Sequence, residues 1–147
     1  MIHTTTIYDQ NNMPSEEKQE AIVSFLYQHL DEYGDEKKYI GQCMDYALQK
    51  TASPGGFIMT IEKDGEINAA TIFNHTGMGG YIPENILVYI ATHANHRGEG
   101  LGSTLMKNAI SHAKGDVALH VEKNNPAIGL YEKLGFTNPY LEMRLKR

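Results

Sequence analysis

The stretch "HANHRGEGLGSTLMKNA", residues 93–109, places three glycines at alternate positions directly after an arginine. Gly98, Gly100 and Gly102 lead into apolar residues that recur every three to four positions, which predicts a helix over residues 101–114. Inside a regular element each glycine costs roughly 0.5–1 kcal/mol relative to alanine. The stretch is therefore either a flexible turn or a loop whose bare amides bind an anion at the positive end of a helix.

Two familiar phosphate-binding motifs do not fit this stretch. A P-loop ends in Gly-Lys-Ser/Thr, and no lysine lies between Gly98 and Met106. The dinucleotide fingerprint GxGxxG, started at Gly98, requires a glycine where Ser103 stands. Glycine spacing alone leaves the structural turn and the anion site equally open.

The rest of the chain predicts a mixture of strands and helices. Asp64-Gly65 between two strand-like runs indicates a tight hairpin, and the nearly continuous apolar run at 84–92 is typical of a strand buried on both faces. The predicted order is strand 3–9, helices 15–31 and 39–50, strands 56–63, 66–74 and 84–92, helix 101–114, strand 116–122, helix 125–135 and strand 141–145. This order predicts an α/β or α+β fold, with residues 1–147 forming one domain.

Composition and charge exclude several classes of protein. Acidic residues outnumber basic ones by 18 to 13 without a strongly basic window, so we expect no nucleic-acid partner. No signal peptide and no apolar run of about 18 residues is found, so we expect no membrane partner. The single Cys43 excludes an internal disulfide and favours a cytoplasmic location, and the seven histidines lack metal-ligand spacing, so we expect no metal.

A second motif follows the glycines in the same order as in a known family. Arg97-x-x-Gly100-x-Gly102 after a buried strand, and then NxxAxxLYxxxGF, resembles the GCN5-related N-acetyltransferase (GNAT) superfamily. The second motif is met by Asn124, Ala127, Leu130, Tyr131, Gly135 and Phe136. The resemblance covers residues 84–145 well, whereas residues 1–83 match only in the order of their elements.

The resemblance implies a fold and a donor. The fold is a mixed, mostly antiparallel sheet flanked by about four helices, in which strands 85–92 and 116–122 run parallel and splay apart. The donor is acetyl-CoA, whose pantetheine arm pairs with the backbone of Ile90 and Thr92, with Asn124 hydrogen-bonding the arm or the incoming amine. The pyrophosphate is held by Arg97 and by the backbone amides of Gly98, Glu99, Gly100, Leu101, Gly102 and Ser103.

The resemblance also assigns a general acid. Tyr131 would protonate the departing CoA thiolate, although its helical spacing from Ala127 also suits a residue that only fills the core. An alkyl amine with a pKa near ~10.4 must lose a proton before it attacks. Many relatives use a glutamate on the central strand, but residues 85–92 contain no carboxylate. The candidates for the base are Glu84, His120 and a water chain. Glu84 lies just before that strand, and strand alternation places His120 on the face of the sheet opposite to that of Val117 and Leu119.

The acceptor is expected at the connection between the first two predicted helices. Asp31, Glu32, Tyr33, Asp35 and Tyr39 there could receive an ammonium group by charge and cation–π contact, or could simply form a solvated helix end. The first hypothesis is an N-acetyltransferase for a small-molecule amine, such as an amino acid, a polyamine or an aminoglycoside-like compound. The alternatives are acetylation of a protein lysine or N-terminus and a non-catalytic acyl-CoA sensor. Because family members often dimerise, a homodimer is a further expectation.

Overall fold

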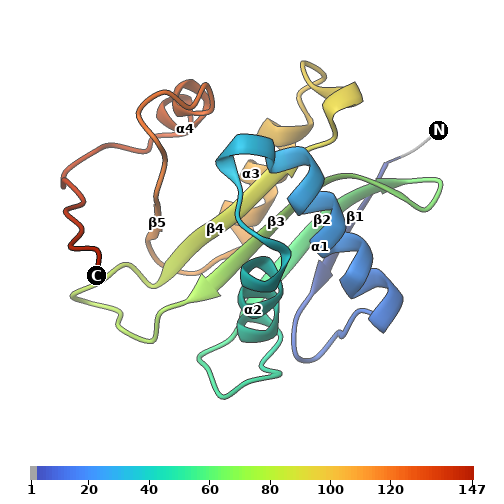
Figure 1. Ribbon diagram of the computed structural model, residues 1–147, viewed down its shortest axis with the longest axis horizontal. Coiled ribbons are helices and arrows are strands. Elements are labelled where there is room, and N and C mark those ends of the chain that lie inside the picture. Colours follow the sequence, from blue (N-terminus) through green and yellow to red (C-terminus); the bar gives the residue numbers. More distant parts are fainter. Residues whose placement is uncertain (1–2) are drawn as a thin grey trace.

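A five-stranded sheet forms the centre of the molecule in the computed structural model, which describes residues 3–147 (Figure 1). Its strands lie in chain order, and neighbours are antiparallel except for the last pair, which is parallel. The sheet contains β1 (Thr4–Tyr8), β2 (Gly56–Lys63), β3 (Glu66–His75), β4 (Asn85–Thr92) and β5 (Val117–Leu119). The predicted mixed, mostly antiparallel sheet with one parallel pair is confirmed.

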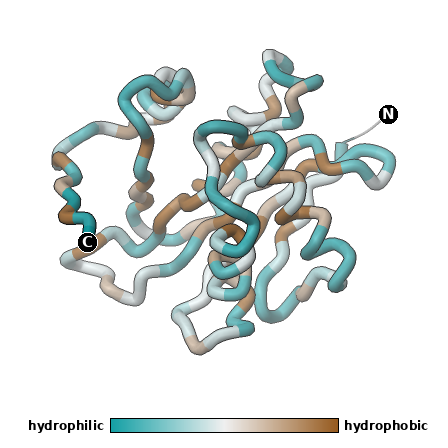
Figure 2. Tube along the Cα trace, viewed as in Figure 1, coloured by the Kyte–Doolittle hydropathy of each residue, from teal (hydrophilic) through white to brown (hydrophobic). Residues whose placement is uncertain are grey.

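Helices cover both faces of this sheet. The helix α1 (Glu16–Leu30) and the helix α2 (Lys37–Ala47) pack on one face, and α3 (Leu101–His112) and α4 (Ile128–Lys133) contribute to the core on the other. Short 3-10 turns, η1 (Asp31–Tyr33) and η2 (Ala94–His96), follow α1 and β4. Figure 2 shows hydrophobic residues concentrated along the central strands, between the two helical layers.

Local sequence signals account for several element boundaries. Ser15 caps α1, because its Oγ accepts a hydrogen bond from the Lys18 amide at 3.1 Å. The β2–β3 hairpin turns at Asp64 and Gly65, whose φ angles of 54° and 80° match the turn expected for this dipeptide. Helix α3 begins directly after Gly100, so the predicted start of that helix is confirmed.

A β-bulge at Val88 places the side chains of Leu87 and Tyr89 on opposite faces of the sheet. Ile72 of β3 pairs with Tyr89, whereas the next residue, Phe73, pairs with Leu87, so Val88 has no opposite residue. As a result Leu87 packs into the core beneath α3, while Tyr89 packs into the core beneath α1 and α2. β4 pairs with β5 only over Asn85–Leu87, so the two parallel strands separate at the position of the bulge.

Two predictions for the C-terminal third are wrong. The strand predicted over 116–122 ends at Leu119, so strand alternation does not fix the side of the sheet on which His120 lies. The predicted strand 141–145 does not form, and Leu141, Met143 and Leu145 are 77–91% exposed. Alternation makes a segment suitable for a sheet, but a strand also needs a partner edge, and this structure pairs residues 141–145 with none of residues 3–147.

Candidate functional site

Residues 97–103, which comprise the connection between η2 and α3 and the first turn of α3, are referred to below as the glycine loop. Gly98 and Gly100 adopt φ angles of 85° and 81°, in the left-handed region that L-residues avoid. A Cβ added at either position would meet no atom within 4 Å. Both glycines are therefore required by the course of the backbone and not by close packing.

The glycine loop leaves donor groups of the backbone uncovered. The amides of Gly100, Leu101, Gly102 and Ser103 donate no hydrogen bond to any of residues 3–147, because the first helical bond of α3 is made by Thr104 to the Gly100 carbonyl at 3.0 Å. Four amides without a partner in that range, at the positive end of a helix of 12 residues, are an arrangement that favours an anion. This position is the one predicted for the pyrophosphate.

Gly102 has a different role from the other two glycines. A Cβ at Gly102 would lie 3.3 Å from Thr92 Oγ1 and 3.9 Å from Leu130 Cδ2. The absence of a side chain therefore lets the first turn of α3 approach both the end of β4 and the helix α4. Gly102 brings the glycine loop, Thr92 and the second motif together.

The charged side chains of the glycine loop have partners within the protein. Arg97 Nη2 donates a hydrogen bond to the His29 carbonyl at 2.8 Å, at the C-terminal end of α1. This bond fixes the position of the guanidinium and leaves its remaining N–H groups for an anion. Glu99 Oε2 lies 3.2 Å from His96 Nδ1, so its carboxylate is held beside an imidazole. Only the backbone amide of Glu99 suits a phosphate, because the carboxylate of its side chain carries a negative charge.

An open strand edge connects the bulge to the glycine loop. Beyond Leu87, β4 continues through Ile90 to Thr92 with β3 on one side and no described strand on the other. An unpaired edge offers N–H and C=O groups to an extended ligand, in the manner of an added strand. Ile90 and Thr92 both belong to this edge, which is where pairing with the pantetheine arm was predicted.

Three predicted residues lie between β5 and the end of α4. His120 directly follows β5 and is exposed, and Asn124 is exposed in the turn before α4. Tyr131 is 8% exposed, and its ring packs against Phe136 at 5.9 Å between centroids. Burial raises the pKa of Tyr131, which keeps its hydroxyl protonated at neutral pH. A protonated phenol suits the proton donor that the motif implies.

Glu84 is held at the start of the pairing between β4 and β5. It directly precedes β4 and lies three residues, or roughly 10 Å, before Leu87, the last residue of β4 that pairs with β5. Its Oε1 accepts a hydrogen bond from the Asp116 amide at 3.1 Å, and its side chain packs closely on Gly115. These contacts fix the start of β4 beside the start of β5.

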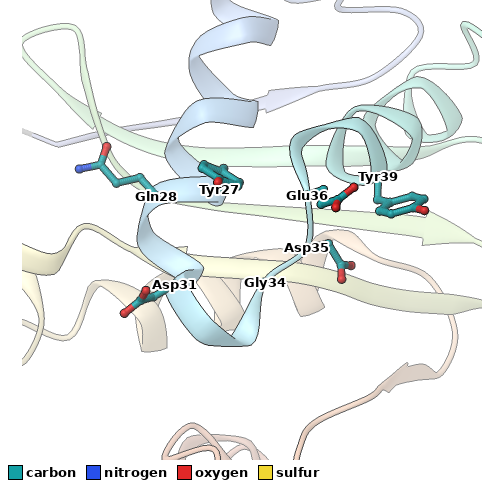
Figure 3. A pocket seen from close by; sticks show the side chains of 7 residues that line it. All are labelled: Tyr27, Gln28, Asp31, Gly34, Asp35, Glu36 and Tyr39. Atoms are coloured by element: carbon teal, nitrogen blue, oxygen red, sulfur yellow. The ribbon is translucent and has the colours of Figure 1, made fainter.

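A cavity of about 530 Å³ lies at the junction of α1, η1 and α2, and we call it the acidic cavity. Figure 3 shows that its lining side chains come from the end of α1 and from the segment leading into α2. Three are carboxylates and two are tyrosines, and none of the seven is a lysine or an arginine. The lining residues are Tyr27, Gln28, Asp31, Gly34, Asp35, Glu36 and Tyr39.

One hydrogen bond connects the acidic cavity to the central strand. Tyr89 donates its hydroxyl to Asp35 Oδ2 at 2.5 Å, across 54 residues of sequence. Burial, followed by the hydrogen bond to Asp35 and the charge of that carboxylate, raises the pKa of Tyr89 well above its ordinary value. Sequence reasoning identified Asp35 as a candidate for acceptor binding but missed Tyr89, because a contact over this separation leaves no local signal.

Comparison with known proteins decides the family. The model of the family described as "Acetyltransferase (GNAT) family" matches residues 18–136, which include both motifs. The chain belongs to the acetyltransferase (GNAT) family. The predicted resemblance is therefore confirmed, and the chain is an N-acetyltransferase by family. Among curated proteins, none matches this acetyltransferase.

Solved structures share the fold of this acetyltransferase over nearly its whole length. A ribosomal-protein-alanine N-acetyltransferase from Brucella melitensis biovar Abortus 2308 is 14% identical, with all of both chains covered and a TM-score of 0.69. The aminoglycoside N-acetyltransferase AAC(6')-Iy, solved in complex with CoA, is 13% identical, with 99% of this chain and 95% of that chain covered and a TM-score of 0.69. A transcriptional regulator from Bacillus halodurans C-125 is 21% identical, with 98% and 100% covered and a TM-score of 0.68.

Two further features of residues 3–147 concern other kinds of partner. None of the helices in this range combines the length and the apolar character needed to cross a membrane. Within the same residues, no three histidine, cysteine, aspartate or glutamate side chains gather in a way that could hold a metal ion.

Proposed function

We propose that this acetyltransferase transfers the acetyl group of acetyl-CoA to a primary amine of a small cationic molecule, by direct attack in a ternary complex. The observation that carries the choice of acceptor is the acidic cavity, which Tyr89 and Asp35 connect to the central strand. The donor half rests on the glycine loop and on the open edge of β4. The two halves are proposed to meet where β4 and β5 separate.

The donor half has three supports. The uncovered amides of the glycine loop and the free N–H groups of Arg97 suit a pyrophosphate, since both supply hydrogen-bond donors to negative oxygens. The open edge of β4 at Ile90 and Thr92 suits an extended pantetheine arm, with Asn124 within the neighbouring turn. The related fold of AAC(6')-Iy carries CoA in its own structure.

The acceptor half depends on charge and on aromatic surface. Asp31, Asp35 and Glu36 give the acidic cavity three formal negative charges, offset locally by Lys38, which lies 3.6 Å from Glu36. Both tyrosines of the cavity have an ammonium group nearby, with Lys37 Nζ 5.4 Å from the Tyr27 ring and Lys38 Nζ 5.0 Å from the Tyr39 ring. Faces that accept a lysine ammonium also suit the ammonium groups of a ligand.

The volume of the acidic cavity is compatible with a small-molecule acceptor. Its volume of about 530 Å³ falls in the range of small-ligand sites, which is roughly 300–1,000 Å³. Two proteins of the same fold differ in the kind of acceptor that their names indicate. One is a ribosomal-protein-alanine N-acetyltransferase, whereas AAC(6')-Iy is an aminoglycoside N-acetyltransferase that was solved with the bisubstrate analog CoA-S-monomethyl-acetylneamine. Acetylation of a protein N-terminus is the second candidate function for this chain.

The chemistry then follows from residues around the separation of β4 and β5. His120 is proposed to remove a proton from the bound ammonium, directly or through water, so that the neutral nitrogen attacks the thioester carbonyl. Collapse of the tetrahedral intermediate breaks the C–S bond, and Tyr131 is proposed to protonate the departing thiolate. The attacking nitrogen then loses its second proton, which returns through water to the Tyr131 phenolate. No chemistry is assigned to Glu84, because its carboxylate accepts a hydrogen bond from the Asp116 amide and packs closely on Gly115.

A panel of amines tests this function. The purified chain is given acetyl-CoA with a polyamine, an aminoglycoside, a neutral amino acid or a peptide with a free N-terminal alanine, and thiol release is followed. We expect the compounds with several ammonium groups to release thiol at the highest kcat/KM. Release with the peptide alone would favour the second candidate, and CoA binding without release for any compound would favour an acyl-CoA sensor.

A further inference from the structure

The end of α1 holds the base of the glycine loop through a single residue, His29. The imidazole Nδ1 of His29 accepts a hydrogen bond from the Ala94 amide at 3.1 Å, and its backbone carbonyl accepts one from Arg97 Nη2 at 2.8 Å. These contacts bridge 65 and 68 residues of sequence. One residue of α1 therefore fixes both ends of the segment that leads from β4 into the glycine loop.

The surroundings of His29 are packed and rich in imidazole. The side chain is 7% exposed, and its ring lies 4.7 Å from that of Phe25 and 4.1 Å from that of His93, centroid to centroid. His93 caps η2 through its own Nδ1, which accepts from the Asn95 amide at 3.1 Å, and its ring lies 5.5 Å from that of His96. The titratable or charged groups that act on His29 are His93 and Arg97, both from the segment that His29 holds, and His96 in turn contacts His93.

We infer that His29 is a positioning residue for the acetyl donor, which fixes the glycine loop in its binding conformation only while its Nδ1 carries no proton. This inference rests on the proposed donor site at the same loop. A protonated imidazole has no acceptor, so it would leave the Ala94 amide unpaired and add a second cation beside Arg97. Loss of the Ala94 hydrogen bond, together with repulsion between the imidazolium and Arg97, would loosen the segment from Ala94 to Arg97 and disorder the amides that receive the pyrophosphate.

The electrostatics of the site favour the form that the geometry requires. Burial, followed by electrostatic interaction with His93 and with the Arg97 guanidinium, lowers the pKa of His29 below its ordinary value. The imidazole therefore remains neutral at neutral pH and keeps its acceptor. As the pH falls through this lowered pKa, donor affinity should fall while the chemistry around Tyr131 is unaffected by His29.

Two substitutions separate this role from simple packing. His29→Leu fills the space but removes the acceptor, whereas His29→Asn places an amide oxygen near the position of Nδ1 and cannot be protonated. At pH 7.5 we expect His29→Leu to raise the KM for acetyl-CoA about tenfold with kcat changed less than twofold, since one buried donor loses its partner. We expect His29→Asn to restore the KM, and to remove the rise in KM that we expect for the unaltered protein as the pH falls below 6.5, the ordinary pKa of histidine.

Further measurements keep the outcomes distinct. CoA binding by titration calorimetry reports on the loop without turnover, and His112→Asn, at the far end of α3, is the matched histidine control. Equal KM values and equal pH profiles for the unaltered protein and both His29 variants would overturn the inference. A fall in kcat with an unchanged donor KM would also overturn it. Absence of CoA binding by the unaltered protein would instead contradict the proposed donor site.

Discussion

Gly100→Ala perturbs the glycine loop through its backbone alone. Gly100 has φ 81° and ψ 7°, and an added methyl group would meet no atom within 4 Å, so the only cost is that of a left-handed alanine. That cost is roughly 1–2 kcal/mol. The smaller unfolded-state entropy of alanine offsets about 0.4–1 kcal/mol of it. We therefore expect a loss of about 1 kcal/mol in the free energy of unfolding, or a fall in Tm of roughly 2–4 °C.

The effect of Gly100→Ala on donor binding should be larger than its effect on stability. If the backbone relaxes to a negative φ, the Gly100 and Leu101 amides turn away from the pyrophosphate. Each lost hydrogen bond to a charged oxygen is worth roughly 1.5–3 kcal/mol, and tenfold in Kd corresponds to about 1.4 kcal/mol. Titration calorimetry with CoA should therefore show a Kd raised at least about tenfold.

A second glycine supplies the matched control. Gly65 in the β2–β3 hairpin has φ 80° and equally open surroundings, so Gly65→Ala carries the same backbone strain in a different turn. The two variants should lose similar stability, and only Gly100→Ala should lose CoA affinity. Equal Kd values for both variants would refute the reasoning, because the loop would then not bind the donor through its amides.

The remaining predictions concern the acid, the acceptor and the buried thiol. Tyr131→Phe should lower kcat at least about tenfold with both KM values little changed, since only the proton donor is removed; an unchanged kcat in steady-state assays would exclude Tyr131 from the mechanism. Asp35→Asn keeps an acceptor for Tyr89 but removes a charge, so the KM for a cationic amine should rise about tenfold, and less in high salt. Burial raises the pKa of the Cys43 thiol to about 12, so a disulfide reagent at pH 8 should modify Cys43 only after denaturation. Because the folded pKa lies above the unfolded value of about 9, the free energy of unfolding measured by urea titration should fall as pH rises from about 9 toward 12.

The sequence was most informative where a local pattern dictates a local structure. The Asp64-Gly65 turn, the Ser15 cap and the start of α3 after Gly100 all depend on residues within one turn of each other. Both motif halves also predicted the family, because they require particular residue types at fixed spacing. The left-handed glycines before α3 follow from the same kind of local pattern, and the role of the glycine loop in binding the pyrophosphate stays a prediction.

Features that depend on contacts between residues far apart in the sequence could not be predicted from local patterns. The hydrogen bonds of Tyr89 to Asp35 and of Ala94 to His29 join segments 54 and 65 residues apart, and neither leaves a periodic signal. The alternation of Leu141 and Met143 suggested a strand, yet strand formation depends on an available edge. The general base remains a proposal for His120, because its role depends on where a bound amine lies relative to the end of β5.

The central claim is that one ligand occupies the glycine loop while another occupies the acidic cavity at the same time. The measurement that tests it most directly is the Kd of a conjugate in which the sulfur of CoA is joined by a short linker to a polyamine. If both sites are engaged together, the conjugate should bind about 100-fold more tightly than CoA, and Asp35→Asn should remove most of that gain. A conjugate that binds no more tightly than CoA, with Asp35→Asn making no difference, would contradict the claim.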